Sequence, residues 1–177
     1  MKLYFVRHGQ TESNAKRLMY GNWDSPLTPE GVEAAMTTAN EISQDFDLIY
    51  SSDLGRAKHT AEILNKKLNL PINYDARLRE RHFGSLEGTD MLSTNKEMWQ
   101  KDHVQEYNYR PWGGESMENV KERIMDFVSD MKKNSRDKKV LVVTHGGIMR
   151  LIYFLLNGKP AEKIHNASVH EFDFPDE

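Results

Sequence analysis

The sequence of 177 residues contains no cysteine, which excludes disulfide bonds and metal sites built on thiolates. It also lacks an excess of basic residues: the formal net charge is −3, whereas non-specific nucleic-acid binding usually requires a basic surface. No apolar run approaches the roughly 20 residues of a membrane-spanning helix, and no apolar signal core precedes the first expected strand. We therefore expect a cytoplasmic protein with neither nucleic-acid nor membrane partners.

Several motifs of nucleotide and cofactor chemistry are absent as well. The sequence has no Walker-type phosphate loop, no dinucleotide-binding glycine fingerprint and no Gly-x-Ser-x-Gly elbow. Five histidines show no spacing typical of metal ligands: His59, His82, His103, His165 and His170. We expect no bound metal and no cofactor.

What the sequence does contain is an alternation of strand-like and helix-like segments. Apolar or alternating runs predict strands at 2–6, 47–52, 71–75, 139–144 and 167–174, and a three-to-four-residue periodicity predicts helices at 27–42, 54–68, about 95–101, 116–133 and 147–158. Thr28 is the expected N-cap of the first helix, and Gly158 is the expected end of the last. This order predicts one α/β domain over residues 1–177, a three-layer α/β/α sandwich with a mostly parallel central sheet.

Two of the predicted strands end on the same dipeptide. The first runs into Arg7-His8-Gly9, and the fourth runs into His145-Gly146-Gly147. Ligands of open parallel sheets bind outside the carboxyl ends of the strands, where both endings can meet Arg56 from the first turn of a helix. A single His-Gly after a strand is most often an ordinary turn. A second one at an equivalent strand end, with an arginine beside the first, favours a shared binding site.

These residue types favour an anion, and phosphate in particular. Arginine presents a planar fork of donors that fits phosphate oxygens, and helix N-termini add backbone N–H groups. Glycine at positions 9, 146 and 147 lets the backbone approach the anion closely. Thr11 and Asn14 lie one to two turns beyond the first strand, where their side chains can donate further hydrogen bonds.

One histidine can also act as a nucleophile. Beside two guanidinium groups a protonated imidazole is disfavoured, so the ring stays neutral near pH 7 and can attack phosphorus. The leaving alkoxide then needs a proton, and Glu80, which follows the third predicted strand, is the candidate acid. The alternative for Glu80 is an ordinary surface position, because it lies in the charged run Arg77–His82.

Five segments in this order resemble the histidine phosphatase superfamily, the phosphoglycerate-mutase-like enzymes. They are VRHGQTESN (6–14), SSDLGRAKHTA (51–61), LRERHFGSLEG (78–88), GGESMENVKER (113–123) and VVTHGGIMR (142–150). The resemblance implies a metal-independent enzyme whose irregular segment 84–114 is a lid that sets substrate specificity. The implied roles are phosphorylated nucleophile for His8, phosphate binding for Arg7, Arg56 and His145, proton donation for Glu80, and pocket or substrate contact for Thr11, Asn14, Gly21 and Gly146.

The family contains both phosphatases and mutases, and the sequence departs from the mutase pattern twice. Gly147 stands where mutases typically carry asparagine, and the expected lid has one arginine, Arg110, where mutases use an adjacent pair. The region is instead rich in aromatic residues, which suit a leaving group with a ring: Phe83, Trp99, Tyr107, Tyr109 and Trp112.

We therefore predict a phosphatase of small phosphomonoesters, of the broad-specificity or α-ribazole-phosphate type. It should prefer aryl or nucleoside-like esters to 3-phosphoglycerate. A 2,3-bisphosphoglycerate-dependent phosphoglycerate mutase is the alternative. A non-catalytic module that binds a phosphorylated ligand is a third reading, which the filled catalytic positions disfavour.

Overall fold

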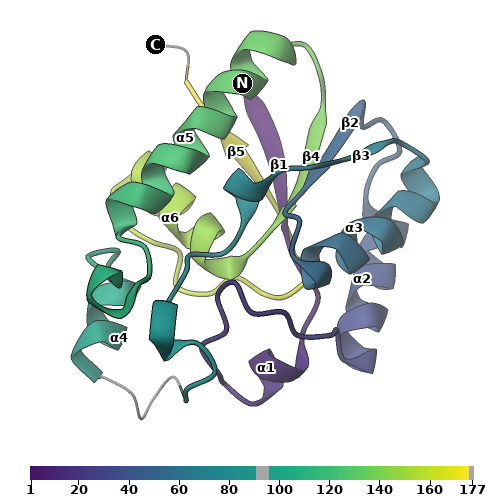
Figure 1. Ribbon diagram of the computed structural model, residues 1–177. Coiled ribbons are helices and arrows are strands. Elements are labelled where there is room, and N and C mark those ends of the chain that lie inside the picture. The colour runs from purple at the N-terminus through teal and green to yellow at the C-terminus, as the bar shows by residue number, and fades with distance from the viewer. Residues whose placement is uncertain (91–95, 176–177) are drawn as a thin grey trace.

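The computed structural model describes residues 1–90 and 96–175, apart from the side chains of Lys96 and Trp99, and these residues form a five-stranded sheet (Figure 1). The strands are β1 (Lys2–Arg7), β2 (Leu48–Ser51), β3 (Ile72–Tyr74), β4 (Val140–Thr144) and β5 (Val169–Asp173). Their order across the sheet is β3-β2-β4-β1-β5. The pairings among the first four strands are parallel, and β5 pairs antiparallel with β1 at one edge.

Helices cover both faces of the sheet, which confirms the predicted α/β/α sandwich. α2 (Pro29–Glu41) and α3 (Gly55–Leu68) lie on one face, and α5 (Met117–Asn134) and α6 (Gly146–Asn157) lie on the other (Figure 1). The short helices α1 (Glu12–Ala15) and α4 (Lys96–His103) lie beyond the carboxyl ends of the parallel strands. Three 3₁₀ turns complete the described elements: η1 (Ala76–Leu78), η2 (Gly84–Leu86) and η3 (Arg110–Trp112).

The core divides into two clusters because successive side chains of a strand point to opposite faces of the sheet. In β4, Val140 and Val142 pack toward α5 and α6, whereas Leu141 and Val143 pack toward α2 and α3. All four side chains are buried. A central strand that is apolar on both faces is what a parallel sheet covered by helices requires.

The structure confirms both helix ends that the sequence predicted, the N-cap at Thr28 and the C-terminal end at Gly158. The Thr28 side chain accepts a hydrogen bond from the Gly31 N–H at 3.0 Å, and α6 ends at Gly158 with φ of 71°. The short helix α1 was not predicted, because four residues are too few to show a helical periodicity. Its Thr11 and Asn14 nevertheless form a capping box, in which each side chain bonds the backbone of the other residue.

The sheet register brings the two His-Gly endings together. Arg7 pairs with Thr144, and the backbone N–H of His8 donates to the Thr144 carbonyl at 2.9 Å. His8 and His145 therefore leave adjacent parallel strands at the same edge. The expected convergence of these two endings follows directly from the neighbouring positions of β1 and β4.

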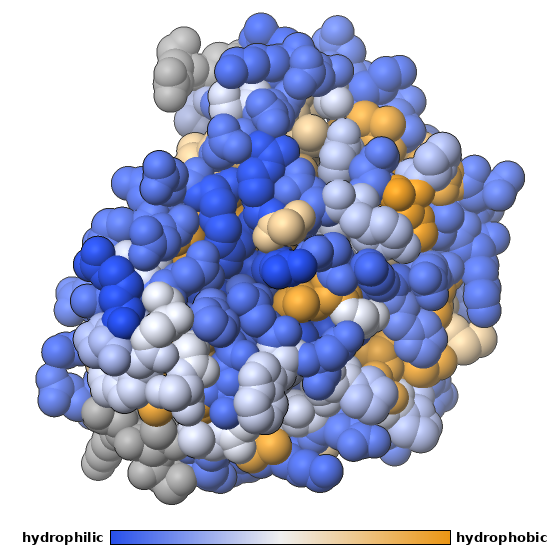
Figure 2. All heavy atoms as spheres, in the orientation of Figure 1, coloured by the Kyte–Doolittle hydropathy of each residue, from blue (hydrophilic) through white to orange (hydrophobic). Residues whose placement is uncertain are grey.

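The segment 84–114 contains η2, α4 and η3, and its role as a lid stays a prediction. The predicted helix near 95–101 corresponds to α4, although residue 95 lies outside the described residues. Among the described residues, no helix has the length and apolar character needed to cross a membrane. The face shown in Figure 2 is mostly hydrophilic, with apolar residues in small separate patches.

Candidate active site

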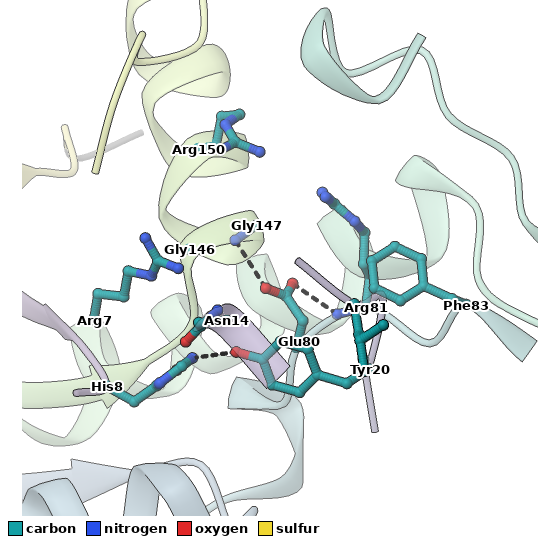
Figure 3. A pocket seen from close by; sticks show the side chains of 12 residues that line it. Arg7, His8, Asn14, Tyr20, Glu80, Arg81, Phe83, Gly146, Gly147 and Arg150 are labelled. Atoms are coloured by element: carbon teal, nitrogen blue, oxygen red, sulfur yellow. Dashed lines mark hydrogen bonds between the residues drawn. The ribbon is translucent and has the colours of Figure 1, made fainter. Parts of the chain in front are cut away.

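A cavity of about 180 Å³ opens where the carboxyl ends of β1 and β4 meet the segment after β3 (Figure 3). Glu80 and three arginines give it its charges, and Gly146 and Gly147 bring the start of α6 to its wall. The residues that line it are Arg7, His8, Asn14, Leu18, Tyr20, Gly21, Glu80, Arg81, Phe83, Gly146, Gly147 and Arg150.

His8 lies at the inner end of this cavity with only 2% of its surface exposed. Its Nδ1 lies 2.7 Å from the Gly9 carbonyl oxygen, and its Nε2 lies 3.4 Å from the Tyr20 hydroxyl (Figure 3). A carbonyl oxygen can only accept, so Nδ1 carries the proton and Nε2 carries the lone pair. The hydrogen-bond network therefore presents the nucleophilic nitrogen toward the cavity.

The surroundings of His8 keep its ring neutral. Burial lowers the pKa of His8 well below its ordinary value, and the positive charges of Arg56 and Arg7 lower it further. The bond to Gly9 acts in the opposite direction but does not reverse the shift. The sequence prediction credited the neutral ring to the arginines, whereas burial is the larger cause.

His145 lies directly beside His8, with 5.1 Å between the two ring centroids. It is completely buried, and its Nε2 lies 2.8 Å from the Ser52 hydroxyl. The Ser52 oxygen also accepts a bond from the Leu54 N–H at 3.3 Å. The other ring nitrogen of His145, Nδ1, is buried and has no hydrogen-bond partner in the described ranges.

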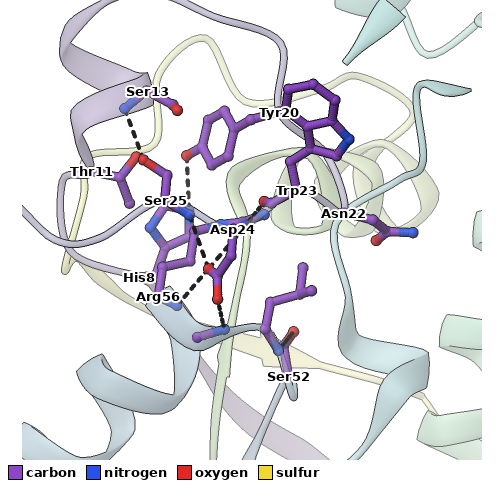
Figure 4. Close-up of polar contacts among 12 residues, drawn as sticks. His8, Thr11, Ser13, Tyr20, Asn22, Trp23, Asp24, Ser25, Ser52 and Arg56 are labelled. Atoms are coloured by element: carbon purple, nitrogen blue, oxygen red, sulfur yellow. Dashed lines mark hydrogen bonds and ion pairs between the residues drawn. The ribbon is translucent and has the colours of Figure 1, made fainter. Parts of the chain in front are cut away.

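Arg7 and Arg56 differ in how they face the cavity. Arg7 lines it: one end of its guanidinium donates to the Ile164 carbonyl at 2.6 Å, and its Nε has no hydrogen-bond partner among the described residues. Arg56 is 1% exposed and donates to the carbonyls of Gly21 and Trp23. Trp23 and Asp24 lie beside it in Figure 4.

The Tyr20 ring covers Arg56, with the guanidinium carbon 4.5 Å from the ring centroid. Arg56 does not line the cavity in this conformation. Tyr20 itself lines the cavity beside His8. Tyr20 is therefore a pocket residue that sequence reasoning missed, since it follows no catalytic motif in the chain.

Glu80 faces His8 from the segment after β3 (Figure 3). Its Oε2 accepts from the Gly147 N–H at 2.9 Å, and its Oε1 accepts from the Arg81 N–H at 2.9 Å. Burial raises the pKa of Glu80, but the Arg81 charge and these two backbone bonds, aided by Arg56, outweigh burial and hold the pKa below its usual range. In the unliganded site Glu80 is a carboxylate.

The other expected binding residues fall into two groups. Asn14, Gly21 and Gly146 line the cavity. Thr11 is completely buried and serves instead as the N-cap of α1, where its side chain holds Asn14.

Arg81 and Arg150 also line the cavity and were missed as site residues. Arg81 was read as part of a charged surface run. Arg150 was quoted only as the last residue of the segment VVTHGGIMR, without a role. The available signal was its position in α6: residues three to four apart share a helix face, and Arg150 is three residues after Gly147.

The structure corrects the expectation about aromatic residues. Phe83 lines the cavity, but Tyr107 and Tyr109 are 2% and 1% exposed and belong to the core under α5 and α6. Trp112 packs partly buried against the same core, and the side chain of Trp99 lies outside the described residues. Arg110 is exposed on η3, where it bonds Asn108, and does not line the cavity.

Comparisons with known proteins identify the family of this chain. The family profile of the histidine phosphatase superfamily (branch 1) matches residues 3–177. The chain belongs to the histidine phosphatase superfamily. A probable phosphoglycerate mutase GpmB from Salmonella paratyphi A is 34% identical over 98% of this chain and 85% of its own length.

Solved structures give the same result for the superfamily fold. YhfR of Bacillus stearothermophilus matches with a TM-score of 0.88 at 30% identity, over 98% of this chain and 91% of that one. The mycobacterial glucosyl-3-phosphoglycerate phosphatase Rv2419c, solved with VO3, matches with a TM-score of 0.85 at 28% identity, over 96% and 91% of the two chains. The superfamily is one of phosphoryl-transfer enzymes, and this chain is such an enzyme. The described part of the chain contains no cluster of three or more potential metal ligands.

Proposed function

We propose that this protein hydrolyses small phosphomonoesters through a phosphohistidine intermediate on His8. The observation that carries the proposal is the orientation of the His8 ring. The Gly9 carbonyl holds the proton on Nδ1, so the lone pair of Nε2 faces a cavity with arginine on one side and a carboxyl group on the other. This is the arrangement that in-line attack on phosphorus requires.

In the first step the Nε2 lone pair forms a bond to phosphorus, and the bond from phosphorus to the ester oxygen breaks. The ring becomes positively charged, and the Gly9 carbonyl at 2.7 Å stabilises the Nδ1 proton of that cation. Arg7 and the backbone N–H groups at the start of α6 stabilise the phosphoryl oxygens. Glu80 gives its proton to the departing alkoxide.

In the second step a water molecule attacks the phosphoryl group. Glu80, now a carboxylate, takes the proton from this water. The bond from Nε2 to phosphorus breaks, inorganic phosphate forms, and His8 returns to its neutral state with the proton still on Nδ1. Neither step requires a redox change, and water is the only other reactant.

The low pKa of free Glu80 has to rise before it can act as an acid. A phosphate dianion placed beside His8 does this, because a nearby negative charge disfavours a second one on the carboxyl group. Substrate binding therefore raises the pKa of Glu80, and the carboxyl group takes from the solvent the proton that the leaving group later receives. Neutral His8 and protonated Glu80 then coexist only when substrate is bound.

Two features support hydrolysis over transfer between two positions of a glycerate. Arg110, the one arginine of the expected lid, is exposed and bonded to Asn108. A Cβ at Gly147 would lie 2.3 Å from Glu80 Oε1, so the asparagine typical of mutases would require Glu80 to move. The similarity to probable phosphoglycerate mutases favours the second candidate, a 2,3-bisphosphoglycerate-dependent mutase.

One assay separates the two candidates. The enzyme is incubated with 3-phosphoglycerate, with and without 2,3-bisphosphoglycerate as primer, and both 2-phosphoglycerate and free phosphate are followed. A phosphatase releases phosphate from this or other monoesters without primer. Primer-dependent formation of 2-phosphoglycerate, much faster than phosphate release, would contradict the proposal and support the mutase.

A further inference from the structure

The connection between α6 and β5 has no role in the proposed hydrolysis, yet it contacts the end of β1 at several points. The Ile164 carbonyl accepts from the Arg7 guanidinium at 2.6 Å, and the Ala167 N–H donates to the Arg7 carbonyl at 2.9 Å. A side chain adds to these bonds, because Nδ2 of Asn166 donates to the backbone carbonyl of His8 at 3.0 Å. The connection therefore holds both residues that the proposal places at the phosphoryl group.

The backbone of this connection adopts an uncommon conformation immediately after Asn166. Ala167 has a φ of 59°, in the left-handed region that residues with a Cβ seldom adopt. Its carbonyl accepts from the Thr38 hydroxyl at 2.8 Å, and the residue is buried. Such a conformation persists only where the surrounding contacts hold it. Because these contacts hold Ala167, they also fix the backbone that carries the Asn166 side chain.

The hydrogen bonds of Asn14 determine which end of its amide is free. Its Oδ1 accepts from the Thr11 backbone N–H and from the Thr11 hydroxyl, both at 3.1 Å. A backbone N–H can only donate, so the atom that it meets is the oxygen. Among the described residues, no partner bonds the NH2 group of Asn14. Because Asn14 lines the cavity (Figure 3), this NH2 group is left to donate to an anion there.

The same logic assigns the amide of Asn166. Its Nδ2 lies 3.0 Å from the His8 carbonyl oxygen and 3.4 Å from Asn14 Oδ1. Both neighbours are acceptors, so the Asn166 atom between them is the NH2 group, which has two protons to donate. The bond to His8 is the shorter and stronger of the two. One amide thus joins the backbone of the nucleophile to the side chain of Asn14.

We propose that Asn166 is a positioning residue for phosphoryl transfer at His8. It fixes the backbone of His8 and helps to hold Asn14 Oδ1, so that the Asn14 NH2 group is the end that meets the phosphoryl oxygens. The inference rests on the proposed hydrolysis and deepens it, because Asn166 does not line the cavity and acts through its neighbours. If Asn166 only stabilised the fold, its loss would lower stability and leave the affinity for phosphate unchanged.

The test is a double-mutant cycle between Asn166 and Asn14. For the wild type, Asn166→Ala, Asn14→Ala and the double variant, we would measure kcat/KM with p-nitrophenyl phosphate and the inhibition constant of inorganic phosphate. Asn157→Ala is the matched control, because this exposed asparagine also donates to a backbone carbonyl, that of Tyr153 at 3.2 Å. Thermal unfolding reports whether each variant is folded. Asn166→Ser replaces Asn166→Ala in the cycle if the alanine variant does not fold.

Asn166→Ala should lower kcat/KM by about 2- to 12-fold, the range expected for one hydrogen bond, and weaken phosphate inhibition. In the Asn14→Ala background this factor should shrink by at least about twofold, because Asn14 no longer transmits it. Asn157→Ala should leave both quantities at their wild-type values. Equal factors in the two backgrounds, or wild-type values for Asn166→Ala, would overturn the positioning role and leave the hydrolase intact. A wild type that releases no phosphate from p-nitrophenyl phosphate would instead count against the proposed hydrolysis.

Discussion

The backbone N–H of Gly147 donates to Glu80 Oε2 at 2.9 Å, which ties the proposed proton donor to the first turn of α6. The contact joins two segments far apart in the sequence, since Glu80 follows β3 and Gly147 follows β4. It fixes the carboxyl group close to His8 and keeps it ionised until a substrate arrives. The first two predictions concern this pair.

Replacing Glu80 by Gln keeps the size of the side chain and removes the transferable proton. We expect Glu80→Gln to slow hydrolysis of alkyl phosphates by about 10²- to 10⁴-fold. p-Nitrophenyl phosphate should be affected much less, because nitrophenolate leaves without protonation. The measurement is kcat for both substrate types. An equal fall in kcat for alkyl phosphates and for p-nitrophenyl phosphate would show that Glu80 acts through its charge or position and not as an acid.

Replacing Gly147 by Ala should separate stability from activity. The new Cβ would meet Glu80 Oε1 at 2.3 Å and Arg81 Nη1 at 2.9 Å, which are the ends of flexible side chains and can shift. Folding should survive, since alanine favours a helix over glycine by roughly 0.5–1 kcal/mol. Turnover of alkyl phosphates should fall by about 10- to 100-fold because the acid is displaced. A Gly147→Ala variant with wild-type turnover would show that catalysis does not need the close approach of Glu80 to the backbone at position 147.

How much of this site was predictable depends on the kind of signal. His8, His145 and Glu80 follow strands, and strand ends in a parallel sheet converge, so sequence reasoning brought them together correctly. Thr28 and Gly158 were found because capping depends on residue type alone. Arg81 and Asp102 meet only through tertiary packing between an irregular segment and α4, which no local pattern encodes.

The difference between local sequence signals and tertiary packing also explains why the role expected for the aromatic residues was wrong. Composition singled out the tyrosines at 107 and 109 as candidates for substrate contact, which was wrong, because composition cannot say whether a ring faces a cavity or the core. The structure places both rings in the core beneath α5, where they support Arg81 and Asp102. The mostly parallel sheet, by contrast, follows from the alternation of strands and helices, although β5 is shorter than predicted and pairs antiparallel with β1.

Folding stability should depend on pH through the two buried histidines. The pKa values of His8 and His145 are both well below the ordinary value, chiefly because of burial. The unfolded chain, with histidine pKa values near 6.5, therefore binds more protons than the folded chain below that pH. The free energy of unfolding should fall as the pH drops from 6.5 toward the folded-state values, by about 1.4 kcal/mol per pH unit for each histidine.

Urea unfolding at pH 7.5, 6.5 and 5.5 measures this slope. His145→Gln removes one of the two groups, so its slope between pH 6.5 and 5.5 should be smaller than that of the wild type by about one proton. An unchanged slope in the variant would mean that His145 is not held neutral. A free energy of unfolding that rises on acidification would mean that folding does not lower the pKa values of these two histidines.

The central claim is that His8 carries the phosphoryl group, and trapping the intermediate tests it most directly. The enzyme is mixed with a phosphomonoester labelled in its phosphoryl group, quenched in base or in acid, and the bound label is located by peptide mapping. We expect label on His8 that survives base and is lost in acid, as a phosphoramidate bond requires, and none in His8→Ala, which should still fold. An acid-stable adduct, or a His8→Ala variant that turns over at near the wild-type rate, would contradict the account.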